Sequence, residues 1–279
     1  MNIQSTVTFL LLALWSCIAL AQELVPQESD VPTKLPPTAD SVIARFVEAK
    51  GGKEKLSSIL SYSLSGVIEI VNEDEREEFG EFQIYQTDGQ SLTRITLPDS
   101  SVMSHGTDGK IAWSISEHGT ASVLKGREAS DFIRHHKTLH GALAWPEQFE
   151  TIRYVGDKTI DGNETRHLIF VESDNRQINR YFSVETGLLI REEQFVGANN
   201  SLQISEISDY QRCPKGTMVS RVKTNSGDRQ GAAKMKWRIK NVFSNDDGIQ
   251  KHLQLPEPIT KLLIAVSYTH LTLPTILLV

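Results

Sequence analysis

Three histidines lie close together in the sequence, and their spacing is the feature that best fits metal chemistry. His136 and His140 are four residues apart, so they would share one face of a helix, and His135 lies beside them. Imidazoles are common zinc ligands, but no Glu or Cys accompanies these histidines at ligand spacing. Half-exposed histidines on an amphipathic helix are therefore the favoured interpretation, and we expect no metal site and no cofactor.

Other reactive residue types also form no catalytic pattern. The acidic run 72–78 is typical of a solvated hairpin loop, because adjacent carboxylates in a loop lack fixed metal geometry. The sequence contains no glycine-rich phosphate loop, G-x-S-x-G, H-E-x-x-H or paired C-x-x-C motif. We expect no catalytic residues and no enzymatic activity. A convergent polar cluster in a cleft would revive the enzyme hypothesis.

Composition and the N-terminus indicate an exported protein that does not bind nucleic acid. The 279 residues carry a net charge of −6, so the basic footprint of a nucleic-acid-binding protein is missing. The uncharged apolar run 7–21 ends in Ala19-Leu20-Ala21, which fits a signal peptidase site. We predict a signal peptide at 1–21, cleavage near Ala21, and a periplasmic or secreted protein.

The alternative is a lipoprotein signal in which Cys17 is lipidated. Cleavage after Ala21 would instead leave Cys213 as the single cysteine, which excludes an intramolecular disulfide. Residues 22–37 contain four prolines and are predicted to form a flexible linker.

Between residues 61 and 243, short runs of alternating apolar and polar residues are separated by glycine turns. Pairs such as Asp88-Gly89 and Asp161-Gly162 supply the positive φ of a tight hairpin. This pattern predicts a long antiparallel meander, which must close into a barrel or have its concave face covered. The strands we expect span 62–70, 79–87, 91–97, 110–117, 121–124, 149–155, 164–171, 178–184, 188–195, 202–210, 218–223 and 234–240.

Helical spacing replaces this alternation in two segments. Segment 40–60 contains a helix, a break at Gly51-Gly52 and a second short helix, and segment 127–143 interrupts the meander and ends before Pro146. We expect the second segment to be a lid over the concave face. The predicted fold is therefore α+β, mainly antiparallel β: an unclosed β-barrel (half-barrel meander) with covering helices.

Large apolar side chains on the strands and the lid are the candidates for lining a ligand cavity. Such residues are equally often plain core, so the sequence alone favours neither role. The lining residues we predict are Leu64, Ile68, Phe82, Trp113, Phe132, Ile133, Phe170, Phe182, Trp237 and Ile239.

The C-terminal segment 259–279 departs from the pattern of the folded domain, which we place at 38–258. From residue 262 the segment has no charged side chain, and it contains Pro274. Residues 266–275 resemble translated sequencing-adapter read-through, so we predict that 259–279 is not native and that the true C-terminus is missing. A membrane anchor is the alternative, for which the segment is barely long enough.

Several turns and strand patterns between residues 40 and 243 resemble the LolA-like family of outer-membrane lipoprotein-sorting proteins. The matching pieces are Gly51-Gly52 with Leu56–Ile59, the strand containing Gly66, Thr107–Trp113, Thr159–Gly162, Tyr181–Arg191 and Ser208–Tyr210. The resemblance implies an unclosed antiparallel barrel whose mouth is covered by helices. It also implies a periplasmic, non-catalytic carrier of lipoprotein acyl chains between membranes. No ligand-contact residue of the family is matched to a position here.

Two functions follow from this reading. The first is a periplasmic carrier for lipoprotein or lipid acyl chains, or for another lipid-like apolar ligand, with inner- and outer-membrane acceptor proteins as possible partners. The second is an envelope sensor or scaffold that uses the same fold to bind a protein partner.

Overall fold

The computed structural model describes residues 37–71, 76–137, 139–196, 201–213, 215–227 and 234–271. The predicted signal peptide, most of the predicted linker and residues 272–279 lie outside the described residues. Residues from 37 onward belong to one compact unit.

The first helix, α1 (Ala39–Ala49), begins at a capping box and ends at two glycines. Thr38 and Ser41 form a capping box, in which each side chain accepts a hydrogen bond from the other residue's backbone N–H. The apolar stripe of the helix, including Phe46, is buried. Gly51 and Gly52 then adopt φ values of 122° and 86°, which end the helix as predicted. A short helix, α2 (Lys53–Ser57), follows directly.

Within the described residues, thirteen antiparallel strands form one sheet. The strands of the first half are β1 (Ser61–Val71), β2 (Arg76–Thr87), β3 (Gln90–Thr96), β4 (Val102–Thr107), β5 (Ala112–Ile115) and β6 (Ala121–Val123). Those of the second half are β7 (Thr151–Ile160), β8 (Asn163–Val171), β9 (Gln177–Ser183), β10 (Leu189–Val196), β11 (Ser201–Arg212), β12 (Met218–Gly227) and β13 (Lys234–Ser244).

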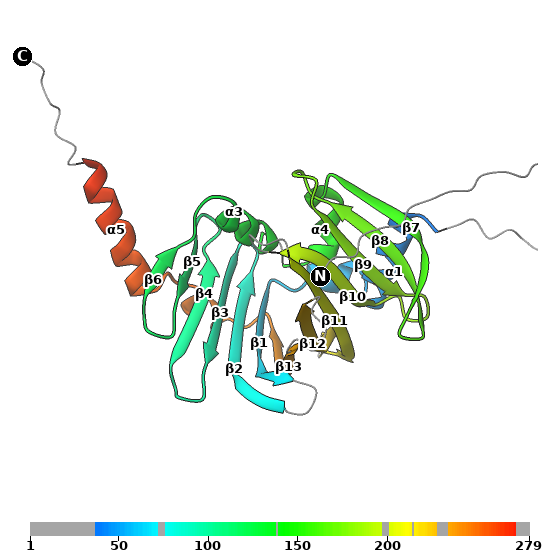
Figure 1. The fold of residues 1–279 in the computed structure, drawn as a ribbon, viewed down its shortest axis with the longest axis horizontal. Helices are drawn as coiled ribbons and strands as arrows, with labels where there is room; N and C mark the ends of the chain where they lie inside the picture. The colour runs from blue at the N-terminus through cyan, green and yellow to red at the C-terminus, as the bar shows by residue number, and fades with distance from the viewer. Residues whose placement is uncertain are drawn as a thin grey trace, which may run out of the picture. The chain divides into compact units, whose positions relative to one another are not determined.

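The order of the strands shows how the chain is wound. The sheet runs β6-β5-β4-β3-β2-β1-β13-β12-β11-β10-β9-β8-β7, so β1 and β13 pair at its centre while β6 and β7 form its two edges. The chain therefore starts at the centre, reaches one edge, crosses to the other edge through residues 124–150, and returns to the centre. Figure 1 shows β6 and β7 on opposite sides, with the crossing segment between them. The predicted unclosed half-barrel is confirmed.

The crossing segment contains two helices, α3 (Gly126–His135) and α4 (Gly141–Gln148), where the sequence predicted one helix over 127–143. The turn between β2 and β3 causes the break. Gly89 donates its N–H to the His136 carbonyl at 3.1 Å, and the Asp88 carboxylate accepts the Leu139 N–H at 2.7 Å. These contacts take backbone groups that a continuous helix needs for its own hydrogen bonds. Pro146 lies inside α4, which continues to Gln148.

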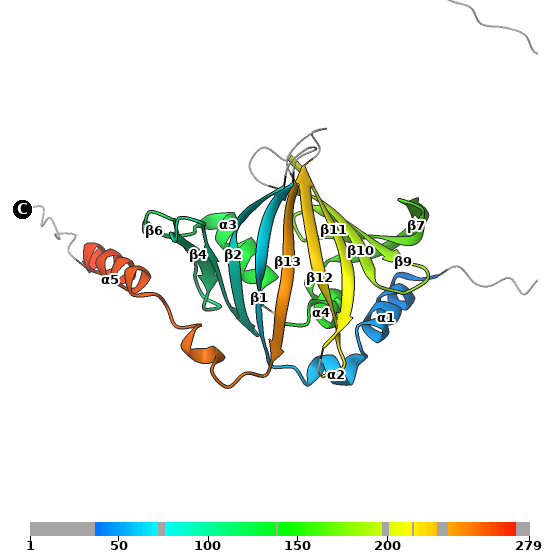
Figure 2. The same ribbon diagram turned by 90° about the horizontal axis from the view of Figure 1, so that it is seen from below.

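The two faces of the sheet are covered by different parts of the chain. We call the face that carries α1, α3 and α4 the inner face (Figures 1 and 2). The ring of Trp145 on α4 lies 5.1 Å from that of Phe170, and Phe132 on α3 lies 5.7 Å from His105 on β4. The two sheet residues, Phe170 and His105, project from the inner face. The crossing segment therefore lies over this face.

The opposite, outer face is covered near β6 by the C-terminal segment. This segment contains the 3₁₀ turn η1 (Ile249–Lys251) and the helix α5 (Glu257–Leu271). Ile249 and Ile259 pack into one buried cluster with Leu92 and Trp113 of the sheet. Residue 259, the first of the segment predicted to be non-native, is thus fully buried, and whether that segment is native stays a prediction.

Sequence patterns located most strands to within a few residues, but β4 was not predicted. Its sequence, Val102–Thr107, contains Ser104, His105 and Gly106, so it lacks apolar alternation. Pairing with β3 and β5 on both sides is what makes it a strand. No helix in the described part of the chain combines the length and the hydropathy needed to cross a membrane.

Gly66 permits the close approach of β1 and β13 at the centre of the sheet. The register of the two strands shifts between Ser65 and Gly66. A Cβ at this position would collide with the carbonyl group of Arg238 on β13 and would lie 2.8 Å from the ring edge of Phe82. We expect Gly66→Ala to lower the free energy of unfolding by about 1–3 kcal/mol, measured by urea denaturation.

The matched control for this prediction is Gly227→Ala. Gly227 ends β12, and a Cβ there meets no heavy atom within 4 Å. The control should unfold near the wild-type midpoint. Equal midpoints for the two variants would contradict the steric argument.

Candidate functional site

The inner face holds an aromatic cluster that joins α1 and α4 to the second half of the sheet. Phe46 of α1 stacks on Trp145 of α4, with ring centroids 5.4 Å apart, and meets Phe182 of β9 edge-on at 5.3 Å. Phe170 on β8 is completely buried in the same cluster. Burial of each such side chain stabilises the fold by about 1.5–3 kcal/mol, so α4 is held mainly by apolar contacts.

A cavity of about 260 Å³ lies beside this cluster, between the helices and the centre of the sheet. Its walls come from α1 and its C-terminal cap, from α2, from the residues that connect α3 to α4, from α4 itself, and from strands β1 and β12. The lining residues are Phe46, Lys50, Leu56, Tyr62, Leu64, Leu139, His140, Gly141, Ala142, Trp145 and Val219. Most of these side chains are apolar, so the cavity suits an apolar ligand or part of one.

Three polar side chains line the cavity, and each has a defined environment. Burial lowers the pKa of the Lys50 ammonium to about 8 and raises the pKa of the Tyr62 hydroxyl to about 12. The imidazole Nε2 of His140 lies 2.6 Å from the carbonyl oxygen of Ile59. The cavity therefore combines apolar walls with an ammonium group and a neutral phenol.

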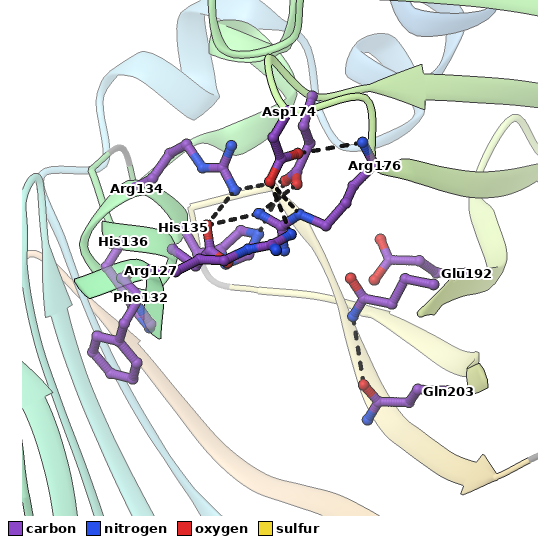
Figure 3. A network of polar contacts seen from close by, with 12 residues as sticks. Arg127, Phe132, Arg134, His135, His136, Asp174, Arg176, Glu192 and Gln203 are labelled. Carbon is purple, nitrogen blue, oxygen red and sulfur yellow. Dashed lines mark hydrogen bonds and ion pairs between the residues drawn. The ribbon is translucent and has the colours of Figure 1, made fainter. Parts of the chain in front are cut away.

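The other helix of the crossing segment, α3, is held by charges. None of its side chains is buried. Six charged residues, which we call the latch, join α3 to the turn between β8 and β9: Arg127, Asp131, Arg134, Glu172, Asp174 and Arg176. Figure 3 labels four of them, Arg127, Arg134, Asp174 and Arg176.

Glu172 is the central residue of the latch. Its side chain is 3% exposed, accepts a hydrogen bond from Arg134 at 2.7 Å and forms an ion pair with Arg176 at 2.8 Å. Asp131 on α3 also pairs with Arg176, at 2.7 Å. Breaking a buried ion pair is costly because it leaves an uncompensated charge. The latch is thus the main attachment of α3, and the contact between Phe132 and His105 is an additional, aromatic one.

A second buried ion pair lies on the inner face between β9 and β10. Arg180 donates from Nε to Glu192 at 2.7 Å, and its guanidinium lies 4.4 Å from the ring centroids of both Trp145 and Phe170. Burial alone would raise the pKa of Glu192, but Arg180 and then Lys223 hold that pKa below its usual value. The pair is therefore ionised and links the sheet to the aromatic cluster.

The structure distributes the predicted lining residues over several places. Leu64 lines the cavity, and Phe170 and Phe182 belong to the adjacent aromatic cluster. Ile68, Phe82, Trp237 and Ile239 form a separate apolar cluster with Ile95 on the inner face. Phe132 and Ile133 lie partly buried on α3.

Trp113 lies on the other side of the sheet from these residues. Its neighbour Ser114 pairs with His105, which contacts α3, and successive strand residues project to opposite faces. Trp113 packs against Ile249 in the outer-face cluster, under the C-terminal segment.

Sequence reasoning missed Lys50, Tyr62 and Trp145 as lining residues. Tyr62 lies on a strand whose alternation was recognised, so its face was predictable in principle. Lys50 is the C-terminal cap of α1 and Trp145 follows the helix break, so their meeting depends on the crossing segment.

His136 and His140 do not share one helix. His136 is the C-terminal cap of α3 and His140 the N-terminal cap of α4, and each ring bonds a different backbone carbonyl. Across the residues that the structure describes, no three His, Cys, Asp or Glu side chains are placed to hold a metal ion together.

Comparison with known proteins shows the fold. The sequence matches no family model and no curated protein. A LolA superfamily protein from Nitrosomonas europaea is similar in structure, with a TM-score of 0.56, 12% identity, and coverage of 79% of this chain and 99% of that one. A DUF1329 family protein from Desulfovibrio piger gives a TM-score of 0.55, 11% identity, and coverage of 77% and 99%.

A third similar structure is a domain from Vibrio parahaemolyticus, assigned provisionally to outer-membrane lipoprotein sorting. It gives a TM-score of 0.53, 8% identity, and coverage of 81% of this chain and 98% of that one. The resemblance predicted from the sequence is confirmed at the level of the fold.

We predict that Glu172→Gln loosens α3 more than the rest of the protein. Loss of the carboxylate charge weakens the charge-assisted hydrogen bond from Arg134, a type worth about 1.5–3 kcal/mol, and removes the ion pair with Arg176. Amide hydrogen exchange in α3 should accelerate by about tenfold or more, while exchange in α1 stays unchanged.

The control is Glu147→Gln, an exposed position on α4 outside the latch. Exchange in α3 should be unchanged in this variant. A uniform acceleration over all helices in Glu172→Gln would show that the latch supports the whole fold and not α3 in particular.

Proposed function

We propose that this protein, which has the LolA-like fold, is a non-catalytic carrier in the bacterial periplasm. Its ligand is the acyl chain of a lipoprotein or of another lipid-like molecule, passed on to membrane acceptor proteins. The observation that carries the proposal is the apolar cavity of about 260 Å³ between the crossing segment and the sheet. The signal-peptide pattern at 1–21 supports the location.

The volume of the cavity limits the length of acyl chain that it can hold. Ligand pockets usually measure about 300–1,000 Å³, so this one accommodates a short chain or the end of a longer chain. Each buried methylene contributes about 0.8 kcal/mol, which corresponds to about a fourfold gain in affinity. Binding is thus driven by apolar surface and does not require a reactive group.

In this proposal a longer chain extends onto the second apolar cluster of the inner face. Ile68, Phe82 and Trp237 lie there with Met103 and Met235, and methionine side chains adapt readily to irregular ligands. Because α3 buries no side chain of its own, displacement of α3 costs little apolar contact. In this proposal the latch opens and the acyl chain extends along the inner face, where the predicted lining residues other than Trp113 meet it.

Binding of saturated fatty acids of increasing length tests the carrier proposal. We expect affinity, measured by calorimetry, to rise about fourfold per methylene and then level off once the accessible apolar space is full. Ligand-free protein that takes up none of these chains would contradict the proposal. Native mass spectrometry of protein from the periplasm would identify a natural ligand.

A variant that fills the cavity provides a second test. Ala142 lines the cavity, so Ala142→Phe should abolish or strongly weaken acyl-chain binding. Ala144→Phe adds the same bulk on the same helix at a position that does not line the cavity, and it should bind normally. Thermal unfolding of both variants verifies that they are folded. Equal binding by the two variants would place the ligand elsewhere.

Binding of a protein partner is the second candidate function. It is favoured by the extent to which the protein's own side chains, such as Phe46, Trp145 and Phe182, fill the inner face. In that case no acyl chain binds, the cavity is a packing defect, and a stable complex copurifies with the protein.

A further inference from the structure

The cavity contains a charged group that an apolar carrier does not need. Among the residues that line it, Lys50 is the one lysine, arginine or acid. No carboxylate in the described part of the chain lies within ion-pair distance of its ammonium group. Its Nζ lies over the ring of Tyr210, 5.9 Å from the ring centroid, which is a cation–π contact near the distance limit of such contacts.

The titratable groups around Lys50 in the described part of the chain carry no negative charge that would balance its ammonium. Burial raises the pKa of the Cys213 thiol and of the Tyr210 hydroxyl, so both are neutral at pH 7. Tyr62 is likewise a neutral phenol, and His140 engages a backbone carbonyl. An ammonium group in such surroundings is costly, and an anionic partner would remove much of that cost.

Tyr62 adds a second donor to the same cavity. Its hydroxyl makes no hydrogen bond to any residue that the structure describes, although it lines the cavity wall on β1. An ammonium and a phenol that both face one cavity are suitable donors for the oxygens of a carboxylate or phosphate. Leu64, Leu139 and Trp145 provide the apolar wall beside them.

We propose that the cavity recognises an anionic amphiphile: its acyl chain packs on the apolar wall and its carboxylate or phosphate binds Lys50 and Tyr62. This inference rests on the proposed carrier function and narrows the ligand class from any acyl chain to one with an anionic group near the chain. Lys50 then sets the orientation of the ligand, because the anionic end must lie beside the end of α1.

The proposal predicts a pH dependence with a definite sign. Lys50 is protonated below a pKa of about 8 in the ligand-free protein, so affinity for an anion should fall as the pH rises above this value. The raised pKa values of Tyr62, Tyr210 and Cys213 keep these neighbours neutral through the start of that range. Affinity for an uncharged amphiphile should not fall.

Calorimetry with three probes of equal chain length tests the inference: dodecanoate, dodecyl phosphate and dodecanol, each below its aggregation limit. At about pH 7, wild-type protein should bind at least one of the two anions about tenfold or more tightly than the alcohol. This preference should shrink at about pH 10. The tighter of the two anions identifies a carboxylate or a phosphate as the preferred group.

Lys50→Met removes the ammonium and keeps an unbranched side chain that is one atom shorter, and Lys53→Met is the matched control. The control makes the same change in net charge. It leaves the cavity intact, because Lys53 is exposed on α2 and does not line the cavity. Lys50→Met should bind the anions no better than the alcohol while binding the alcohol at least as well as wild type. Lys53→Met should keep the wild-type preference.

The outcomes separate this inference from the carrier proposal. If wild type binds all three probes equally, or Lys50→Met keeps the preference for anions, the inference is overturned and the carrier function stands. If wild type binds none of the probes, both are overturned. If Lys50→Met binds dodecanol with the same affinity as the wild-type protein, the variant is folded.

Discussion

The structure depends on one constraint of chain topology: β1 and β13 pair at the centre of an open sheet, so the chain must pass from one edge to the other in mid-sequence. Residues 124–150 make this passage over the inner face. Backbone polar groups that cross an apolar surface need internal partners, and helices supply them. The covering of the sheet by α3 and α4 therefore follows from the order of the strands.

The two helices of the crossing segment are attached by different forces. The ring of Trp145 fixes α4 within an aromatic cluster, whereas α3 depends on the ion pairs around Glu172. Apolar burial gives stable attachment over a broad surface, while charge-assisted hydrogen bonds are directional and are lost together when one partner moves. One half of the inner face, beside the cavity, is thus covered through apolar packing, and the other half is covered through ion pairs.

The cavity combines two features that reduce stability. Unfilled space loses packing contacts, and the Lys50 ammonium is partly desolvated with no counterion in the described part of the chain. Proteins commonly retain such costs where a ligand compensates them. The same ligand would fill the space and neutralise the charge, which is why these two observations are best explained together.

The sequence by itself determined the local elements: the end of α1 at Gly51-Gly52, the hairpin turns, and the antiparallel meander interrupted by helical residues. These follow from backbone conformation and from side-chain periodicity, which act over a few residues. Only the tertiary structure decided that the Asp88-Gly89 turn splits the predicted lid, that Trp113 lies on the outer face, and that Lys50 meets Tyr62 and Trp145 in one cavity. Those outcomes depend on contacts between residues far apart in the chain, and local patterns carry no information about which distant residues will meet.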